Sequence, residues 1–417
     1  MNFRSSKRYR SRLSAYSMAF GVVFITLCMV QYPKDAFDSA IMGLNLWWSV
    51  VFPALLPFFI LSEILMGLGV VHFIGVLLEP LMRPLFNVPG VGAFALSMGL
   101  ASGYPMDAVI TCKFRKSQLC SAVEAERLLS FTNTADPLFM FGAVAVGMFG
   151  MPELGVILAL AHYLASFLVG MIFRFHGTDR DVPPKPSQQE SSGNLVSRAF
   201  RALYQAKQED GRPIGLLLGD SVKSSMNTAL LIGGFIILFS VFLRMLSIIG
   251  ATDTLAAIFS GVLQWLGLSG NLAESLVSGL FEIDLGTLAA SQADAPLWQK
   301  TVMTSAIIAW SGLSVHGQVA SIVIESGIRM APYMVARFLH ALLAGLLTLL
   351  FFDHMDTVSR LFVTPVLFDQ TGNLSAAYWL TRLEQVSYQL LLLLAILVSL
   401  SITLHILRGV YTYAIKK

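Results

Sequence analysis

Charged residues are scarce in this sequence. They make up 13% of the 417 residues, whereas soluble domains carry about 25%. Hydrophobic residues reach 55%, and the mean hydropathy is +0.70. The shortage of charge indicates a chain that is solvated by lipid. The net charge is only +3, and no basic stripe alternates with aromatic residues, so nothing indicates nucleic-acid binding.

The sequence also lacks the signature motifs of common enzymes. It contains no Walker A motif, no GxSxG and no HExxH, so we expect neither an enzyme nor direct use of ATP. Its three cysteines form no CxxC and no metal-binding spacing with histidine. This pattern favours single reduced thiols, and we expect no metal and no cofactor.

Long apolar runs are present instead. A helix that crosses the bilayer needs about 20 mainly apolar residues. Lysine and arginine gather in the N-terminal arm and in alternate loops, which is typical of cytoplasmic segments. We therefore predict an all-α polytopic membrane protein with about eight transmembrane helices and both termini in the cytoplasm. The expected spans are residues 13–33, 39–62, 130–151, 154–173, 224–243, 301–324, 331–352 and 385–407.

Two further apolar segments, 70–128 and 252–298, are interrupted by glycine, and the first also by proline. Broken backbone at membrane depth is tolerated only where protein or a water-filled cavity covers it. We predict that each segment forms an interfacial helix followed by a re-entrant hairpin.

The two halves of the chain align weakly after a shift of 181 residues, which places 63–69 on 244–250. Each half has the order helix, broken hairpin, polar-interrupted helix, helix, and the halves are expected to cross the membrane in opposite directions. Such inverted repeats are typical of secondary transporters, whose sites lie where the repeats meet. The expected division is a basic arm and first transmembrane helix (1–38), the first repeat (39–176), a cytoplasmic linker (177–213), the second repeat (214–352), and an outside loop with the final transmembrane helix (353–417).

Two polar clusters interrupt the first repeat. One runs from Ser102 to Asp107 at the expected tip of the first hairpin, and the other from Thr132 to Pro137 early in the next span. Helix ends there would leave backbone groups free to hold ions, although a solvated loop and an ordinary helix cap are the alternatives. The candidates are Gly103, Tyr104, Asn133 and Thr134 for substrate, and Asp107 and Asp136 for a coupling H⁺ or Na⁺.

Two more clusters interrupt the second repeat. Glu282 and Asp284 lie in an apolar stretch, where carboxylates are costly unless they face water, a partner or a ligand. The run from Trp310 to Gln318 places polar side chains on one helical stripe, and a small-residue packing seam is the alternative. The candidates are Gly286, Thr287, Ser311, Ser314 and Gln318 for substrate, and Glu282 and Asp284 for the coupling ion.

Four further polar residues lie in apolar helices. We expect His162 and His340 to be core histidines whose hydrogen bonds are satisfied. Arg337, near the start of its helix, is expected to extend to the membrane interface. Arg244 could do the same or could neutralise an anionic substrate.

These clusters resemble a known family. The run 45–330 is similar to the nucleoside-recognition (Gate) domain, which is related in fold to concentrative nucleoside transporters. The resemblance rests on Gly103-Tyr-Pro-Met-Asp107, Glu282-Ile-Asp284 and Ser311-Gly-Leu-Ser314, and it implies that two hairpins and an unwound helix line the site. Tyr-Pro stands where nucleoside transporters have Gln-Thr-Glu, which leaves the substrate open.

Over its whole length the chain resembles the YlbJ-type sporulation integral membrane proteins of endospore-forming Firmicutes. The shared features are the basic arm, Ser102-Gly-Tyr-Pro-Met, Thr132-Asn-Thr-Ala-Asp-Pro and His316-Gly-Gln. The resemblance implies a lipid-embedded transporter of a small organic anion, dipicolinic acid, across the outer forespore membrane of the mother cell. A homo-oligomer is a further expectation, because related folds trimerise. The alternatives are a cation-coupled nucleoside transporter and a non-transporting sporulation scaffold.

Overall fold

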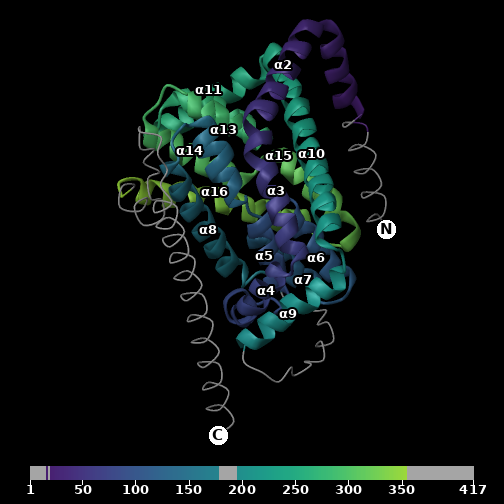
Figure 1. Ribbon diagram of the computed structural model, residues 1–417. Coiled ribbons are helices and arrows are strands. Elements are labelled where there is room, and N and C mark those ends of the chain that lie inside the picture. The colour runs from purple at the N-terminus through teal and green to yellow at the C-terminus, as the bar shows by residue number, and fades with distance from the viewer. Residues whose placement is uncertain (1–15, 17–18, 178–194, 355–417) are drawn as a thin grey trace, which may run out of the picture.

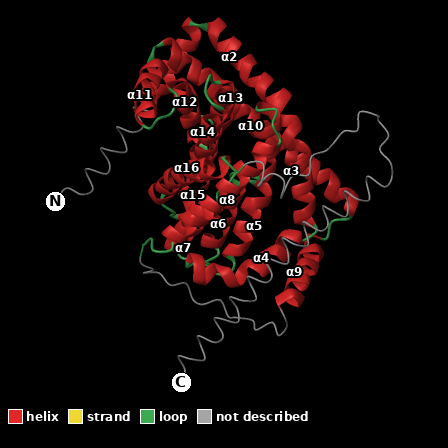
Figure 2. Ribbon diagram, turned by 90° about the vertical axis from the view of Figure 1, so that its left-hand side faces the viewer, coloured by secondary structure: helices red, strands yellow, loops and turns green. Residues whose placement is uncertain are grey.

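The computed structural model describes residue 16 and residues 19–177 and 195–354, and every regular element within them is a helix (Figure 2). The expected all-α fold is therefore confirmed for this part of the chain. We call the two sequence repeats the first and the second copy. The first copy contains α2 (Pro33–Leu46), η1 (Trp47–Val51), α3 (Phe52–Gly67), α4 (Val70–Leu81), η2 (Met82–Phe86), α5 (Gly92–Ser102), α6 (Met106–Lys116), α7 (Ala122–Thr132), η3 (Phe139–Met148) and α8 (Glu153–Phe173). The second copy contains α10 (Ile214–Ile248), α11 (Ala251–Trp265), η4 (Gly270–Leu272), α12 (Ala273–Phe281), α13 (Ile283–Gln292), α14 (Leu297–Trp310), α15 (Gly312–Val323), η5 (Ile324–Ser326) and α16 (Met330–Phe352).

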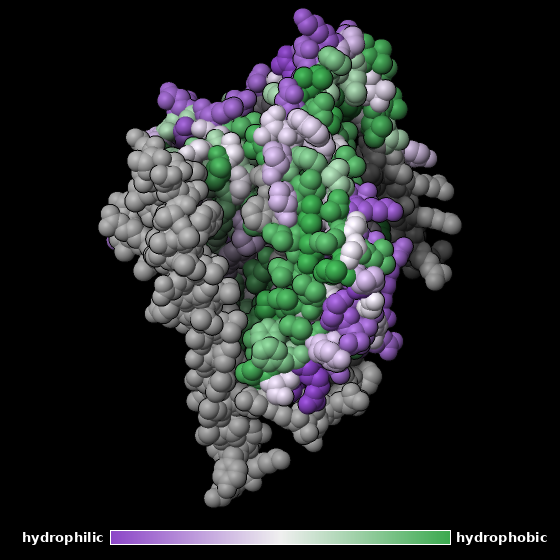
Figure 3. Space-filling view, viewed as in Figure 1, coloured by the Kyte–Doolittle hydropathy of each residue, from purple (hydrophilic) through white to green (hydrophobic). Residues whose placement is uncertain are grey.

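Within the described residues, four helical segments are long and apolar enough to cross a bilayer. A fifth candidate is the pair Pro33–Val51 and Leu55–Gly67, which bends by 53°. Apolar side chains cover the middle of one face of the molecule, and hydrophilic ones gather toward its upper end and lower right (Figure 3). The four candidates are Glu153–Phe173, Ile214–Ile248, Leu297–Ser326 and Met330–Phe352, and the third of them is interrupted at Ser311 between α14 and α15.

Three expected spans need comment. The first corresponds to a shorter apolar helix, Ala19–Gln31. The continuous span expected at 130–151 is wrong, because α7 ends at Thr132 and η3 begins at Phe139. Pro137 between them has no N–H to donate to a preceding turn. The span expected at 385–407 lies outside the described residues, as does most of 353–417.

The two broken segments each form one longer helix and then a pair of short helices. In the first copy these are α4 and the pair α5–α6, and in the second copy α11 and the pair α12–α13. The first set lies at the lower end of the molecule and the second at the upper end (Figure 1). This arrangement agrees with the sequence expectation, while the inverted relation of the copies across a membrane stays a prediction.

α4 and α11 are each preceded by a glycine with positive φ. Gly69 precedes α4 with φ 82°, and Gly250 precedes α11 with φ 75°. Both lie in the left-handed region, which glycine enters without the penalty of a Cβ atom. The two glycines are the pair that the 181-residue shift superposes, so the weak alignment marks a real structural correspondence.

The two copies pack directly on one another through α10, which lies along α2 and α3. Trp47 donates its indole N–H to the carbonyl oxygen of Ala229 over 2.9 Å. A Cβ atom on Gly233 would lie 2.6 Å from the same indole ring. Small residues let membrane helices approach closely, and here a glycine makes room for the tryptophan that joins the copies.

The segment 177–213, expected as a hydrophilic linker, contains α9 (Leu195–Asp210), and residues 178–194 lie outside the described part. α9 packs against α4. The rings of Phe200 and Phe73 lie 5.0 Å apart, and Arg198 pairs with Glu79 at 2.7 Å. The periodic apolar face of α9 explains why this part of the linker is ordered on the bundle.

Candidate functional site

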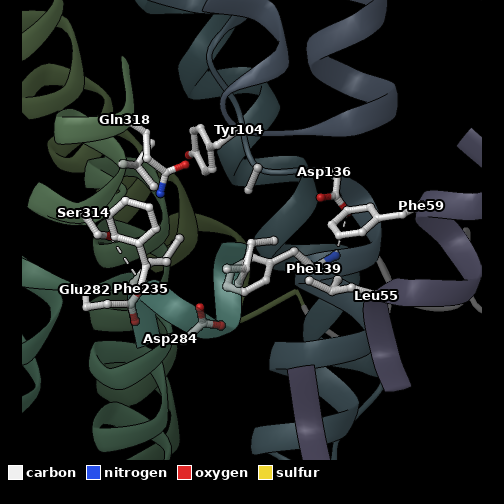
Figure 4. A pocket seen from close by; sticks show the side chains of 14 residues that line it. Leu55, Phe59, Tyr104, Asp136, Phe139, Phe235, Glu282, Asp284, Ser314 and Gln318 are labelled. Carbon is white, nitrogen blue, oxygen red and sulfur yellow. Dashed lines mark hydrogen bonds between the residues drawn. The ribbon is translucent and has the colours of Figure 1, made fainter. Parts of the chain in front are cut away.

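A small cavity of about 70 Å³ lies where both short-helix pairs and both helix breaks meet (Figure 4). A cavity of this size holds a few water molecules. Aromatic and aliphatic side chains from α3 and α10 form part of its lining. The lining residues are Leu55, Phe59, Tyr104, Ala135, Asp136, Phe139, Ile232, Phe235, Glu282, Ile283, Asp284, Ser314, Val315 and Gln318.

Residues from all four predicted clusters line this cavity, although they are far apart in the sequence. They are Tyr104, Asp136, Glu282, Asp284, Ser314 and Gln318. The other candidates support these elements without lining the cavity. They are Gly103, Asp107, Asn133, Thr134, Gly286, Thr287 and Ser311.

Glu282 joins the second short-helix pair to the broken helix. It precedes α13, and its Oε2 accepts a hydrogen bond from the backbone N–H of Leu285 over 3.0 Å. Its Oε1 accepts from the hydroxyl of Ser314 over 3.5 Å. The carboxylate therefore caps α13 and reaches the first turns of α15, so a change at Glu282 is transmitted to both elements.

Asp136 caps the helix that follows it. Its Oδ1 accepts hydrogen bonds from the N–H groups of Leu138 and Phe139 over 2.9 and 2.8 Å, so the helix-cap alternative is correct for this residue. A Cβ atom on Gly103 would lie 2.7 Å from Oδ2 of Asp136. Gly103 has φ 64° and ψ −161°, a region that is almost confined to glycine.

Asp107 belongs to a closed polar network beside the cavity. Its carboxylate accepts from the amide of Asn133 over 2.8 Å and from the hydroxyl of Thr132 over 3.3 Å. The amide oxygen of Asn133 accepts from the hydroxyl of Tyr333 over 2.8 Å. Asn133 therefore links the two copies structurally. The sequence alone makes it a candidate for substrate binding.

Arg337 does not extend to an interface, so that expectation is wrong. Its side chain is fully buried, and it donates to the backbone oxygens of Ser130 and Asn133. These carbonyls lie at the end of α7, where no further helical turn supplies a donor. The sequence carried a signal for this role, because Arg337 is the one charge in a 22-residue apolar run.

The remaining candidates are satisfied locally. The hydroxyl of Thr287 donates to the carbonyl of Ile283 over 2.8 Å, and Thr134 donates to Thr132 over 3.4 Å. Ser311 has φ 70° and separates α14 from α15. Its hydroxyl donates to the carbonyl of Trp310, so its role here is to break the helix.

Both histidines lie in the core as expected, but their hydrogen bonds are only partly satisfied, because Nδ1 of each ring is buried without a partner among the described residues. Nε2 of His162 accepts from the N–H of Ala135 over 3.1 Å, and Nε2 of His340 lies 2.8 Å from the carbonyl oxygen of His162. Their rings are 4.4 Å apart. Arg244, whose role was left open, pairs with Asp35 at 2.5 Å on a half-exposed surface.

An ion cluster outside the candidate spans also joins the two copies. Glu126 on α7 is buried and accepts from Arg329 over 2.6 and 2.7 Å. Nε2 of His176 lies 2.8 Å from the same carboxylate. Burial alone would raise the pKa of Glu126, but the hydrogen bonds from Arg329 and His176 outweigh it and hold the pKa below its usual 4.5.

We expect Glu126→Gln to lower stability by roughly 1–3 kcal/mol at neutral pH, because it weakens hydrogen bonds to a charged group. The folded pKa lies below the unfolded one, so this contribution is present above pH 4.5 and is lost as the pH falls through the folded pKa. Thermal unfolding of both proteins in detergent over a pH series measures the difference. A difference that stays constant down to acid pH would contradict this account.

The chain is similar to known proteins in sequence and, more weakly, in structure. A family model described as nucleoside recognition (Gate) matches residues 48–152 and 229–329. The sporulation integral membrane protein YlbJ of Bacillus subtilis (strain 168) is 45% identical over 354 residues, which is 83% of this chain and 85% of that protein. The solved structure of CNTnw in an inward-facing substrate-bound state covers 83% of this chain and 87% of its own, with 13% identity and a TM-score of 0.44.

Proposed function

Because the chain belongs to the family of the sporulation integral membrane protein YlbJ, we propose that it is a secondary transporter of a small organic anion, dipicolinic acid. The proposed place of action is the outer forespore membrane of the mother cell. The observation that carries the proposal is the cavity in Figure 4, where polar residues of both copies converge between apolar helices. Transporter sites of this kind lie at the interface of repeats.

The lining of the cavity sets a condition on this substrate. Tyr104, Ser314 and Gln318 offer hydroxyl and amide groups that suit a carboxylate. Asp136, Glu282 and Asp284 would repel it. An anion therefore needs a coupling H⁺ or Na⁺ to offset those charges, and transport is proposed to be coupled to one of them.

A cation-coupled nucleoside transporter is the second candidate. It is favoured by the match to the nucleoside-recognition family and by Glu282 at the turn of the second short-helix pair, where a ribose hydroxyl could donate to it. A non-transporting scaffold is the third candidate. It is disfavoured because a scaffold has no need of broken helices around a polar cavity.

The test is uptake of radiolabelled dipicolinate into proteoliposomes that contain the purified protein. We expect saturable uptake that excess uridine leaves unchanged and that falls about tenfold or more in Glu282→Gln, since this carboxylate caps α13 and accepts from Ser314 on α15. The matched control is Glu153→Gln, which removes an exposed carboxylate at the start of α8, and it should transport as the wild type does. Uptake of uridine in place of dipicolinate would favour the nucleoside transporter, and uptake of neither would favour the scaffold.

A further inference from the structure

Three buried carboxylates line the cavity, and none of its lining residues is Lys, Arg or His. Asp136, Glu282 and Asp284 are exposed by 5%, 3% and 2%. Uncompensated charge at membrane depth is costly, and ionisable residues there mark ion paths and proton relays. At least one of these groups is therefore expected to be neutral or to hold a cation during part of the transport cycle.

The three carboxylates differ in their partners. Asp136 accepts two backbone N–H groups, and Glu282 accepts one backbone N–H and a hydroxyl. Oδ1 of Asp284 is buried and accepts from no donor within the described residues. Asp284 is the carboxylate in the cavity whose charge is least compensated, because its neighbours supply the fewest hydrogen bonds.

The charged groups around Asp284 do not change this conclusion. α10, α12, α14 and η3 pack against α13. Glu274 lies in the first turn of α12, and Asp220 and Lys223 lie in the first half of α10. The charged group that acts on Asp284 is Glu282, at the turn between α12 and α13. Lys300 on α14 donates to the carbonyl of Ser291 near the other end of α13. Arg244 on α10 pairs with Asp35, and across the cavity lie Asp136 and the phenol of Tyr104.

A second cavity lies beside the same part of α13. It has a volume of about 610 Å³ and is lined by polar groups that include Asp35, Arg244 and Asp253. It reaches α13 at Leu285 and Leu288. Leu285 follows Asp284 directly, so the two cavities touch neighbouring residues at the start of α13.

We propose that Asp284 is the proton site of this transporter, a step that rests on the proposed function. One proton from water adds to its carboxylate and forms the neutral acid, and the same proton returns to water when the site opens to the other side. The neutral acid no longer repels an anion, and its O–H can donate to a substrate carboxylate.

The first experiment needs no substrate. Infrared spectra of the purified full-length protein, recorded over a pH series, should show the C=O stretch of a protonated carboxyl that disappears as the pH rises. We expect this band to be absent in Asp284→Asn and unchanged in Asp294→Asn, which alters an exposed carboxylate just beyond α13. If Asp284→Asn does not fold, Asp284→Glu keeps a carboxyl and should shift the band.

The second experiment uses dipicolinate in proteoliposomes. One coupled proton allows up to about tenfold accumulation per pH unit of gradient. We expect the wild type to approach this value, and Asp284→Asn to equilibrate dipicolinate without accumulating it. Loss of the band in Asp284→Asn without any dipicolinate uptake by the wild type would support the proton site and reject the substrate.

Three results would overturn the proton site. One is a titrating band that survives in Asp284→Asn or vanishes in Glu282→Gln instead. Another is accumulation that follows a sodium gradient and ignores pH. The third is an Asp284→Glu protein whose band equals that of the wild type.

Discussion

Replacing Arg337 with methionine should leave little folded protein, with an expected loss of roughly 3–5 kcal/mol in stability. The guanidinium is fully buried and donates to two carbonyl oxygens at the end of α7. Its charge also lies near the buried carboxylate of Asp107, which hydrogen bonds join to Asn133 and Tyr333. Methionine fills much of the volume but supplies no donor and no charge, so both carbonyls lose their donor and the buried carboxylate of Asp107 loses a nearby positive charge.

The amount of monodisperse protein after detergent extraction and its thermal unfolding measure this loss. The matched control is Arg244→Met, which removes a half-exposed arginine paired with Asp35. Exposed ion pairs contribute about 0–1 kcal/mol, so the control should unfold close to the wild type. If both variants were equally stable, the network around Arg337 would not hold the two copies together as described.

The breaks in the fold could be predicted from the sequence, because their causes are local. Gly69 and Gly250 adopt positive φ in matched turns. The break before Pro137 also has a local cause, because proline has no N–H to donate, although a continuous span was expected there. Glu282 and Asp284 were recognisable for a similar reason, since two carboxylates in an apolar stretch are costly wherever they lie. The meeting of the four polar clusters at one cavity could be expected from the weak repeat, because sites in such repeats lie where the two halves meet.

The role of each polar residue could not be predicted, because its partners come from distant parts of the chain. Asn133 contacts Tyr333 across 200 residues, and Arg337 contacts Ser130 across 207. The spacing of residues in the sequence gives no information on such pairs. The sequence therefore could not show that the carboxylate of Asp107 accepts hydrogen bonds from Thr132 and Asn133. Nor could it show that Oδ1 of Asp284 has no donor among the described residues.

Replacing Gly286 with alanine should abolish transport and lower stability by roughly 1–3 kcal/mol, the usual cost of an overpacked contact. A Cβ atom on Gly286 would fall on the backbone of Gly279, where no side chain can turn aside. α13 must then move away from α12, and it carries Asp284 at its start. The displacement reaches the cavity, so uptake should fall more than the stability loss alone explains.

The matched control for this change is Gly261→Ala in α11, where nothing lies within 4 Å of the added carbon. Alanine favours a helix by up to about 1 kcal/mol over glycine, so this variant should be as stable as the wild type or more stable. Uptake per folded molecule and thermal unfolding separate the two effects. Equal behaviour of the two alanine variants would mean that α12 and α13 need no close contact, and the geometry of the cavity would then depend on other elements.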